Sequence, residues 1–128
     1  MYVEDDPINI VFGKSLFSKI GHDITVAENG IECLEKMKRN KYDLVLMDIQ
    51  MPIMSGIEAI SEIRKMENNS GFHQPVIALT AFSMRGDKEL YLEDGFDGYV
   101  SKPLSIKELI SEISRVMDKY GALGTSNE

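Results

Sequence analysis

The sequence predicts a single α/β domain built on a parallel β-sheet. Short runs of apolar and β-branched residues alternate with longer helical segments, and five such pairs follow one another along the chain. Two of these runs, "DLVLM" at 43–47 and "PVIALT" at 75–80, are nearly continuous in apolar residues, which is typical of strands covered by helices on both faces. The length of 128 residues suits one domain with one core.

The strands are predicted from short apolar runs bounded by turn residues. They cover residues 1–4, 23–27, 43–47, 75–80 and 97–101. The second run is short and alternates polar with apolar residues, so it is expected near an edge of the sheet. Pro75 stands at the start of the fourth run, where a missing N–H group is tolerated.

The helices are predicted from cap residues followed by helical apolar spacing. The expected caps and first-turn partners are Asp6 with Pro7, Asn29 with Glu32, Ser55 with Glu58, and Ser105 with Glu108. The residues expected to face the core from the first and last helices are Val11, Leu16, Phe17 and Ile20, and Ile106, Leu109, Ile110, Ile113 and Met117. Segment 83–95 is the weakest helix, because Gly86 costs about 1 kcal/mol relative to alanine in a helix interior.

Composition excludes several classes of function. The formal net charge of -7 argues against direct nucleic-acid binding, since the neutralisation of phosphates needs a basic surface. No stretch has the roughly 18 apolar residues of a membrane span, so no membrane contact by this chain is expected. Cys33 is the single cysteine and cannot form an internal disulfide, which fits a cytoplasmic location. His22 and His73 are expected to be isolated loop residues on the surface.

The carboxyl ends of four predicted strands carry ionisable or hydroxyl side chains. They are Glu4 and Asp5, Asp48, Thr80 and Lys102, after the first, third, fourth and fifth strands. In a parallel sheet with helices on both faces, ligands bind beyond these strand ends. We therefore expect the five side chains to share one edge of the sheet.

The chemistry of this set points to phosphoryl transfer. Three neighbouring carboxylates repel one another unless they share a cation, and Mg²⁺ prefers carboxylate, carbonyl and water oxygens. An aspartate beside such an ion can attack phosphorus and form an aspartyl phosphate. An ammonium group and a hydroxyl group can then stabilise the transferring phosphoryl oxygens.

Four blocks of the sequence resemble the receiver domain of two-component response regulators. They are "VEDDPIN", "DLVLMDIQMPIMSG", "PVIALTA" and "GYVSKPL", in the order and spacing of that family. The resemblance covers residues 1 to about 120, and the four blocks together are highly specific. It implies a flavodoxin-like (βα)5 fold in three layers, with a parallel five-stranded sheet in the order 2-1-3-4-5.

The resemblance also implies a metal site and a phosphoacceptor. By position in the blocks, Asp48 is similar to the phosphoacceptor, which also binds the metal, and Asp5 to a direct ligand of Mg²⁺ or Mn²⁺. Glu4 resembles the acid that reaches the metal through water. The backbone carbonyl of Gln50 resembles the remaining protein ligand.

Further residues match the family's phosphate-binding and switch positions. Lys102 resembles the phosphate-binding lysine, Thr80 the switch hydroxyl, and Tyr99 the aromatic residue whose rotamer follows phosphorylation. Pro103 resembles the proline after that lysine, and the peptide bond before it is expected to be cis. Phe82 is expected to border the phosphoryl site, where its bulk would screen attacking water.

The implied function is phosphorelay signalling. The expected partner is a histidine kinase or a phosphotransfer domain, and an effector or a second copy of the chain is expected to bind the 84–119 face. The chain would catalyse only its own phosphorylation and dephosphorylation. A phosphohydrolase of the aspartyl type would need an aspartate where Gln50 stands, and a dinucleotide-binding domain would need a G-x-G-x-x-G turn that is absent. A phosphorylation-independent interaction domain on the same fold is the remaining alternative.

The domain is expected to span residues 1–120, followed by a C-terminal tail or linker at 121–128 with the composition "GALGTSNE". The stretches "DPIN" and "MDIQMP" resemble receivers attached to hybrid sensor histidine kinases. The abrupt start and the linker-like tail favour an excised receiver over a single-domain regulator.

Overall fold

The computed structural model describes residues 1–68, 70–81 and 87–121. Its sheet has five parallel strands in the order β2-β1-β3-β4-β5, so the predicted fold class and strand order are confirmed. The strands are β1 (Tyr2–Val3), β2 (Val26–Ala27), β3 (Val45–Asp48), β4 (Val76–Thr80) and β5 (Gly98–Ser101). The helices are α1 (Pro7–Lys19), α2 (Gly30–Arg39), α3 (Gly56–Glu67), α4 (Asp87–Asp94), α5 (Ile106–Val116) and the π-helix η1 (Met117–Gly121).

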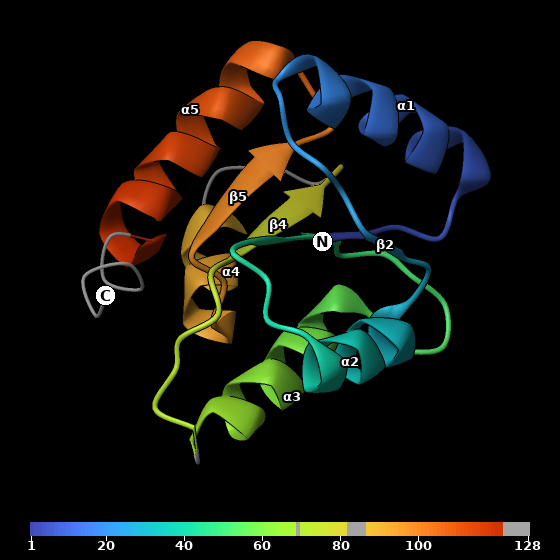
Figure 1. Cartoon of the computed structure of the whole chain (residues 1–128). Coiled ribbons are helices and arrows are strands. Elements are labelled where there is room, and N and C mark those ends of the chain that lie inside the picture. The colour runs from blue at the N-terminus through green and yellow to red at the C-terminus, as the bar shows by residue number, and fades with distance from the viewer. Residues whose placement is uncertain (69, 82–86, 122–128) are drawn as a thin grey trace.

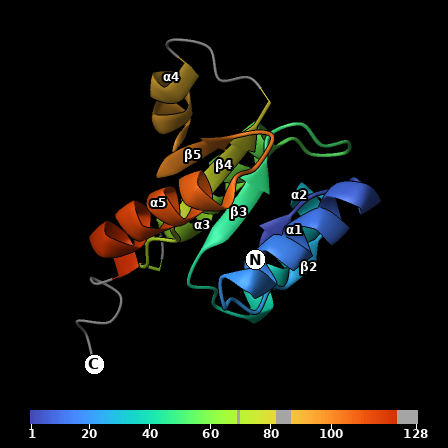
Figure 2. The same ribbon diagram turned by 90° about the horizontal axis from the view of Figure 1, so that it is seen from above.

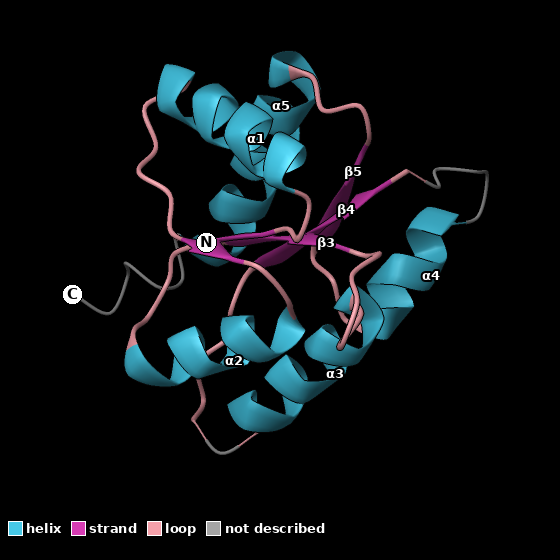
Figure 3. Cartoon of the chain, turned by 90° about the vertical axis from the view of Figure 1, so that its right-hand side faces the viewer, coloured by secondary structure: helices cyan, strands magenta, loops and turns pink. Residues whose placement is uncertain are grey.

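Helices cover both faces of the sheet and form three layers (Figure 1). Figure 3 shows α1 and α5 on one face and α2, α3 and α4 on the other. Seen from above, β3, β4 and β5 lie side by side, with α4 near the β5 side of the sheet (Figure 2). The two halves of the core therefore lie above and below the sheet.

Each strand begins later than the sequence predicts. The difference is largest for β2, which starts at Val26 instead of residue 23. This edge strand pairs with β1 alone, through Tyr2 with Val26 and Val3 with Ala27. The Tyr2 N–H still donates to the Thr25 carbonyl at 2.8 Å, but the paired ladder is only two residues long because β1 itself has only two residues.

Two helices expose apolar residues that were predicted to face the core. Val11 of α1 is 70% exposed, and Ile106 and Ile110 of α5 are each more than 40% exposed. On α1 the contact with the sheet is centred on Gly13, where an added Cβ atom would lie 2.4 Å from the ring of Tyr2. The helix packs so closely there that its buried stripe is narrow, and Val11 lies outside it.

The predicted helix caps form. The Ser55 hydroxyl accepts a hydrogen bond from the Glu58 N–H while the Glu58 carboxylate accepts one from the Ser55 N–H, which completes a capping box. The Asp6 side chain caps α1, and Ser105 caps α5. Local sequence therefore sets where these helices begin.

A polar network ties α3 to the amino ends of β4 and β5. Arg64 Nη2 lies 3.0 Å from Asp97 Oδ2 and donates to the Gly95 carbonyl, while the Val76 N–H donates to the same Asp97 oxygen. His73 lies on the surface, as predicted, but it is not isolated, because its Nε2 lies 2.7 Å from Asp97 Oδ1. The buried Asp97 carboxylate bonds this ring. The contact could not be predicted from local sequence, because the two residues lie 24 positions apart.

Side chains of α5 cover part of the outer edge of β5. The Tyr99 N–H donates to Glu112 Oε2 at 2.9 Å, and Arg115 Nη2 donates to the Asp97 carbonyl at 2.8 Å. Glu112 and Arg115 are also ion-paired to each other. Two backbone groups on the side of β5 away from β4 are thus bonded within the molecule.

Within the described residues, no helix has the length and apolar character needed to cross a membrane.

Candidate functional site

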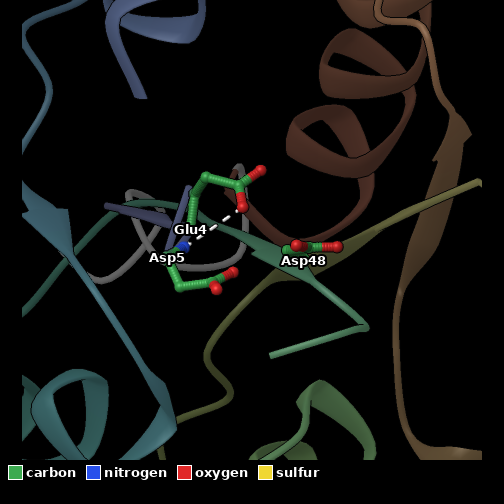
Figure 4. A group of neighbouring side chains, drawn as sticks. All are labelled: Glu4, Asp5 and Asp48. Atoms are coloured by element: carbon green, nitrogen blue, oxygen red, sulfur yellow. Dashed lines mark hydrogen bonds between the residues drawn. The ribbon is translucent and has the colours of Figure 1, made fainter. Parts of the chain in front are cut away.

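Three carboxylates meet at the carboxyl ends of β1 and β3. Oxygen atoms of Glu4, Asp5 and Asp48 all lie within 4.8 Å of one another (Figure 4). Glu4 is 1% exposed and Asp48 is 5% exposed, whereas Asp5 is partly exposed. The cluster is therefore open to solvent mainly on the Asp5 side.

Lys102 places its ammonium group between two of these carboxylates. Its Nζ atom lies 3.1 Å from Asp48 Oδ1 and 3.1 Å from Glu4 Oε1. Burial lowers the pKa of Lys102, but the attraction of Asp48 and the hydrogen bond to Glu4 outweigh it, so the pKa is raised. The lysine is charged at neutral pH, and the peptide bond between Lys102 and Pro103 is cis.

Glu4 and Asp5 differ in how their carboxylates are bonded. Glu4 Oε1 accepts from Lys102, and Glu4 Oε2 accepts from the N–H groups of Asp5 and Asp6 at 3.1 and 3.3 Å. For the Asp5 carboxylate, the described part of the chain supplies no hydrogen bond or ion pair. Glu4 is thus fixed in place, and Asp5 is available to a ligand.

Asp48 is positioned by the backbone around it. It ends β3, where it pairs in register with Leu79 of β4, and its Oδ1 atom accepts from the Gln50 N–H at 3.3 Å. The first residue of α3, Gly56, packs on this segment, because a Cβ atom there would lie 2.6 Å from the Asp48 carbonyl oxygen. Ile53, in the loop between them, is 74% exposed and has a φ of 70°, a strained conformation for a β-branched residue.

Thr80 ends β4, beside the strand that carries Asp48. Its carbonyl accepts from the Lys102 N–H at 2.7 Å, so the chain after β5 returns to the same edge. Its hydroxyl lies 2.9 Å from the hydroxyl of Tyr91 on α4. Tyr99 is half-buried on β5, and its ring centroid lies 6.1 Å from that of Tyr91.

The structure brings together most of the site residues predicted from the sequence, and it shows one further residue, Tyr91, in contact with them. Glu4, Asp5, Asp48 and Lys102 form one cluster, while Thr80 is linked to it through the Lys102 backbone. Phe82 lies outside the described residues. Tyr91 was missed, since it stands inside a weak helix and not at a strand end, and nothing in the sequence marks it.

These donors fit a divalent cation bound through oxygen. Among the described residues, three carboxylates face one ammonium group, so this part of the chain leaves the partly buried site with excess negative charge. Such a site attracts a hard cation, and Mg²⁺ takes one or two carboxylates together with waters and a phosphate group. The residues can therefore hold Mg²⁺ next to a nucleophilic carboxylate.

The chain matches the family description "response regulator receiver domain" over residues 1–114. Among known proteins, it is 46% identical over 125 residues to hybrid signal transduction histidine kinase I of Dictyostelium discoideum. That match covers 94% of this chain but only 7% of the kinase. The likeness therefore concerns one domain of a much longer protein.

Two solved receiver domains have the same fold. One, from a sensor histidine kinase of Pseudomonas aeruginosa and described with a magnesium ion in its active site cleft, is 34% identical at a TM-score of 0.76. The match covers 93% of both chains. The other, from a Saccharomyces cerevisiae response regulator solved with a histidine phosphotransfer protein, is 29% identical at a TM-score of 0.82 and covers 95% of this chain and 88% of that one.

Proposed function

We propose that Asp48 accepts a phosphoryl group from a phosphohistidine, because this chain belongs to the family of response regulator receiver domains. The donor is a histidine kinase or a phosphotransfer domain. The observation that carries the proposal is the cluster in which Lys102 lies 3.1 Å from both Asp48 and Glu4, with Asp5 beside them.

The transfer is a displacement at phosphorus. A carboxylate oxygen of Asp48 forms the new P–O bond while the P–N bond of the donor breaks, and its electron pair leaves with the imidazole nitrogen. Lys102 is already charged and within reach of Asp48, so it can pair with a phosphoryl oxygen without any proton transfer. The nucleophile and the charge that stabilises the product are thus in place before the donor arrives.

Mg²⁺, or Mn²⁺ in its place, would neutralise the phosphoryl oxygens when bound at the acidic cluster. Asp5 and Asp48 suit direct coordination, together with the backbone carbonyl of Gln50. Glu4 suits contact through water, because both of its oxygens already accept hydrogen bonds from the protein. The free carboxylate of Asp5 and the fixed one of Glu4 support this division of roles.

Thr80 and Tyr99 would carry the signal away from the site. The Thr80 hydroxyl would donate to a phosphoryl oxygen, and Tyr99 would change rotamer as Thr80 moves. These residues lie on β4 and β5, next to the 84–119 face through which an effector or a second copy would bind. The described part of that face, residues 87–119, contains α4, β5, α5 and the first part of η1.

The donor must reach Asp48, so it is expected to contact the surface around the carboxyl ends of the strands. Large apolar side chains are exposed there. They are Ile8, Val11 and Phe12 of α1 and Ile53 of the loop after β3, each more than half exposed. Large apolar side chains exposed near the site suit a surface that binds another protein.

The wider context follows from the same relatives. The likeness to a hybrid histidine kinase supports a receiver, residues 1–120, that is part of a longer cytoplasmic kinase chain, with 121–128 as its tail or linker. Residues 122–128 lie outside those described. A phosphorylation-independent interaction domain is disfavoured, because the acidic pair, Asp48, Thr80 and Lys102 are all present.

The test is phosphorylation by a small donor. Wild-type protein incubated with Mg²⁺ and acetyl phosphate should gain the mass of one phosphoryl group by intact-mass spectrometry, and Asp48→Asn should gain none. Asp43→Asn, at an exposed aspartate two residues before β3, should behave as wild type. A wild-type chain that gains no phosphoryl group would contradict the proposal.

A further inference from the structure

Tyr91 of α4 bonds the hydroxyl that the proposed switch depends on. Its phenol oxygen lies 2.9 Å from Thr80 Oγ1. Thr80 is 1% exposed and Tyr91 is 9% exposed, so water has little access to either residue. The contact joins β4 to α4 across 11 residues of sequence.

A phosphoryl group on Asp48 would compete for the same hydroxyl. A threonine hydroxyl has one proton to donate, whereas phosphoryl oxygens only accept. Either hydroxyl can donate in the resting contact, and once Thr80 gives its proton to a phosphoryl oxygen it can only accept from Tyr91. A move of the side chain toward the β3 end also carries the oxygen away from α4.

We propose that Tyr91 is a positioning residue that holds Thr80 in the unphosphorylated arrangement, and that release of this hydrogen bond passes phosphorylation to α4. The inference rests on the proposed function and extends it to a residue outside the acidic cluster. According to this inference, the Tyr91 hydroxyl stabilises the unphosphorylated arrangement of Thr80 and not the phosphorylated one.

The ring of Tyr91 connects the hydroxyl contact with Thr80 to the packing of α4 on β5. Its ring packs edge-on against Phe96, with centroids 6.3 Å apart, and lies 6.1 Å from the ring of Tyr99. Tyr91 therefore contacts Thr80 through its hydroxyl and β5 through its ring. A change at the hydroxyl alters the packing of α4 against β5.

Beryllofluoride, a phosphoryl analogue that binds aspartate with Mg²⁺, measures the effect without a donor protein. Tyr91→Phe keeps the ring and removes the hydroxyl. It should bind beryllofluoride about three- to tenfold more tightly than wild type, because one net hydrogen bond of the resting arrangement is gone. Tyr42→Phe, a half-buried tyrosine just before β3, should match wild type.

A double-mutant cycle separates this role from a general effect on folding. In a Thr80→Ala background, Tyr91→Phe should leave beryllofluoride affinity unchanged, because the bond no longer exists. An unchanged or weaker affinity of Tyr91→Phe in the wild-type background would overturn the inference. So would an equal gain in both backgrounds.

The wild-type protein offers a second measurement that depends on no variant. The nuclear Overhauser effect between the Thr80 methyl group and the Tyr91 ring should weaken on addition of Mg²⁺ and beryllofluoride, and an unchanged signal would overturn the inference. Wild-type protein that binds beryllofluoride while Tyr91→Phe shows no gain refutes only the role of Tyr91. Wild-type protein that neither binds beryllofluoride nor gains a phosphoryl group overturns the proposed function and this inference with it.

Discussion

At the residue scale, Asp48 depends on a glycine eight positions later in the chain. The Gly56 N–H donates to the Ile49 carbonyl at 2.9 Å, and its Cα lies against the backbone of Asp48 and Ile49. The atoms nearest to a Cβ built on Gly56 all belong to the backbone of Asp48 and Ile49. The nucleophile is therefore held by backbone packing on one side and by Lys102 on the other.

Gly56→Ala should destabilise the fold and move Asp48. Its Cβ atom would meet the Asp48 carbonyl oxygen at 2.6 Å and the Ile49 Cα at 2.9 Å, and backbone atoms cannot turn away as side chains do. We expect the free energy of unfolding, measured with urea, to fall by about 1–3 kcal/mol. Phosphorylation by acetyl phosphate should slow in the same variant.

Gly30→Ala is the matched control for this prediction. Its Cβ atom would also come close to a neighbour, at 2.8 Å, but that neighbour is the flexible side chain of Met54. The cost should be smaller than for Gly56→Ala, and phosphorylation should be unaffected. Equal losses of stability in the two variants would contradict the argument from backbone contact.

At this scale, the residues of the site were predictable from the sequence, but some of their individual contacts were not. Glu4, Asp5, Asp48 and Lys102 were predictable because strand ends in a parallel sheet share an edge. The partner of Thr80 was not, since Tyr91 reaches it from a helix whose pattern carries no sign of a buried face. The contact of His73 with Asp97 spans 24 residues and depends on the position of a loop.

At the scale of elements, α1 has an unusual distribution of apolar residues. It buries Gly13, Leu16 and Phe17 on the sheet, while Ile8, Val11 and Phe12 face solvent beside the site. A helix that is apolar on both sides is not explained by the core alone. The exposed side is consistent with a surface that docks the phosphoryl donor.

Phe12→Ser should slow phosphoryl transfer from a protein donor. Its rate of phosphorylation by acetyl phosphate should stay at the wild-type value, which makes that rate the internal reference. Phe12 is 53% exposed, so the substitution removes little core packing. We expect the rate of transfer from a phosphorylated phosphotransfer domain at low concentration to fall by about tenfold, as for a large interface side chain. Radiolabelled transfer assays give both rates.

Ile110→Ser, at a 43% exposed position on α5, is the control for Phe12→Ser. It removes an apolar side chain of similar exposure from another helix and should leave transfer from the protein donor near the wild-type rate. A result in which Ile110→Ser slows transfer as much as Phe12→Ser would mean that α1 is not the preferred docking surface.

Helix starts were predictable from local signals, and helix faces were less so. The caps at Asp6, Asn29, Ser55 and Ser105 form because each depends on residues within one turn. Which side of α1 is buried depends instead on how Gly13 meets Tyr2, a contact with another element. Periodicity alone placed Val11 on the wrong side.

At the scale of the whole molecule, three groups hold their protons more strongly in the folded state. Burial raises the pKa of the Cys33 thiol from 9.0 to about 12. Burial and the neighbouring Glu4 raise the pKa of the Tyr2 phenol, and the pKa of Lys102 is raised by Asp48 and Glu4 against the effect of burial. The folded state thus binds more protons than the unfolded state at alkaline pH, and stability falls there.

Cys33 should account for most of the loss of stability that begins near pH 9. Its contribution is fully present below the unfolded thiol pKa of 9.0 and is lost progressively as pH rises toward about 12. Between pH 9 and 10 the free energy of unfolding should fall by about 1.4 kcal/mol per pH unit at the steepest. Cys33→Ala should show a flatter curve over this range in urea unfolding, apart from a constant offset.

Parallel curves for wild type and Cys33→Ala would contradict the assignment to the thiol. Above about pH 10 both proteins should lose stability, because Tyr2 and Lys102 are present in each. The parallel sheet with helices on both faces was predictable at this scale from the alternation of strand and helix segments, whereas the order of the strands came from the resemblance to receiver domains.

The edge of β5 limits how this molecule can meet others. Glu112 and Arg115 occupy the Tyr99 N–H and the Asp97 carbonyl that an added strand would need. A protein that binds at this side of the sheet must therefore recognise side chains, and two copies cannot extend their sheets into one through these groups. Because Glu112 bonds the backbone of Tyr99 itself, binding at the edge and a change at that tyrosine act on the same few atoms.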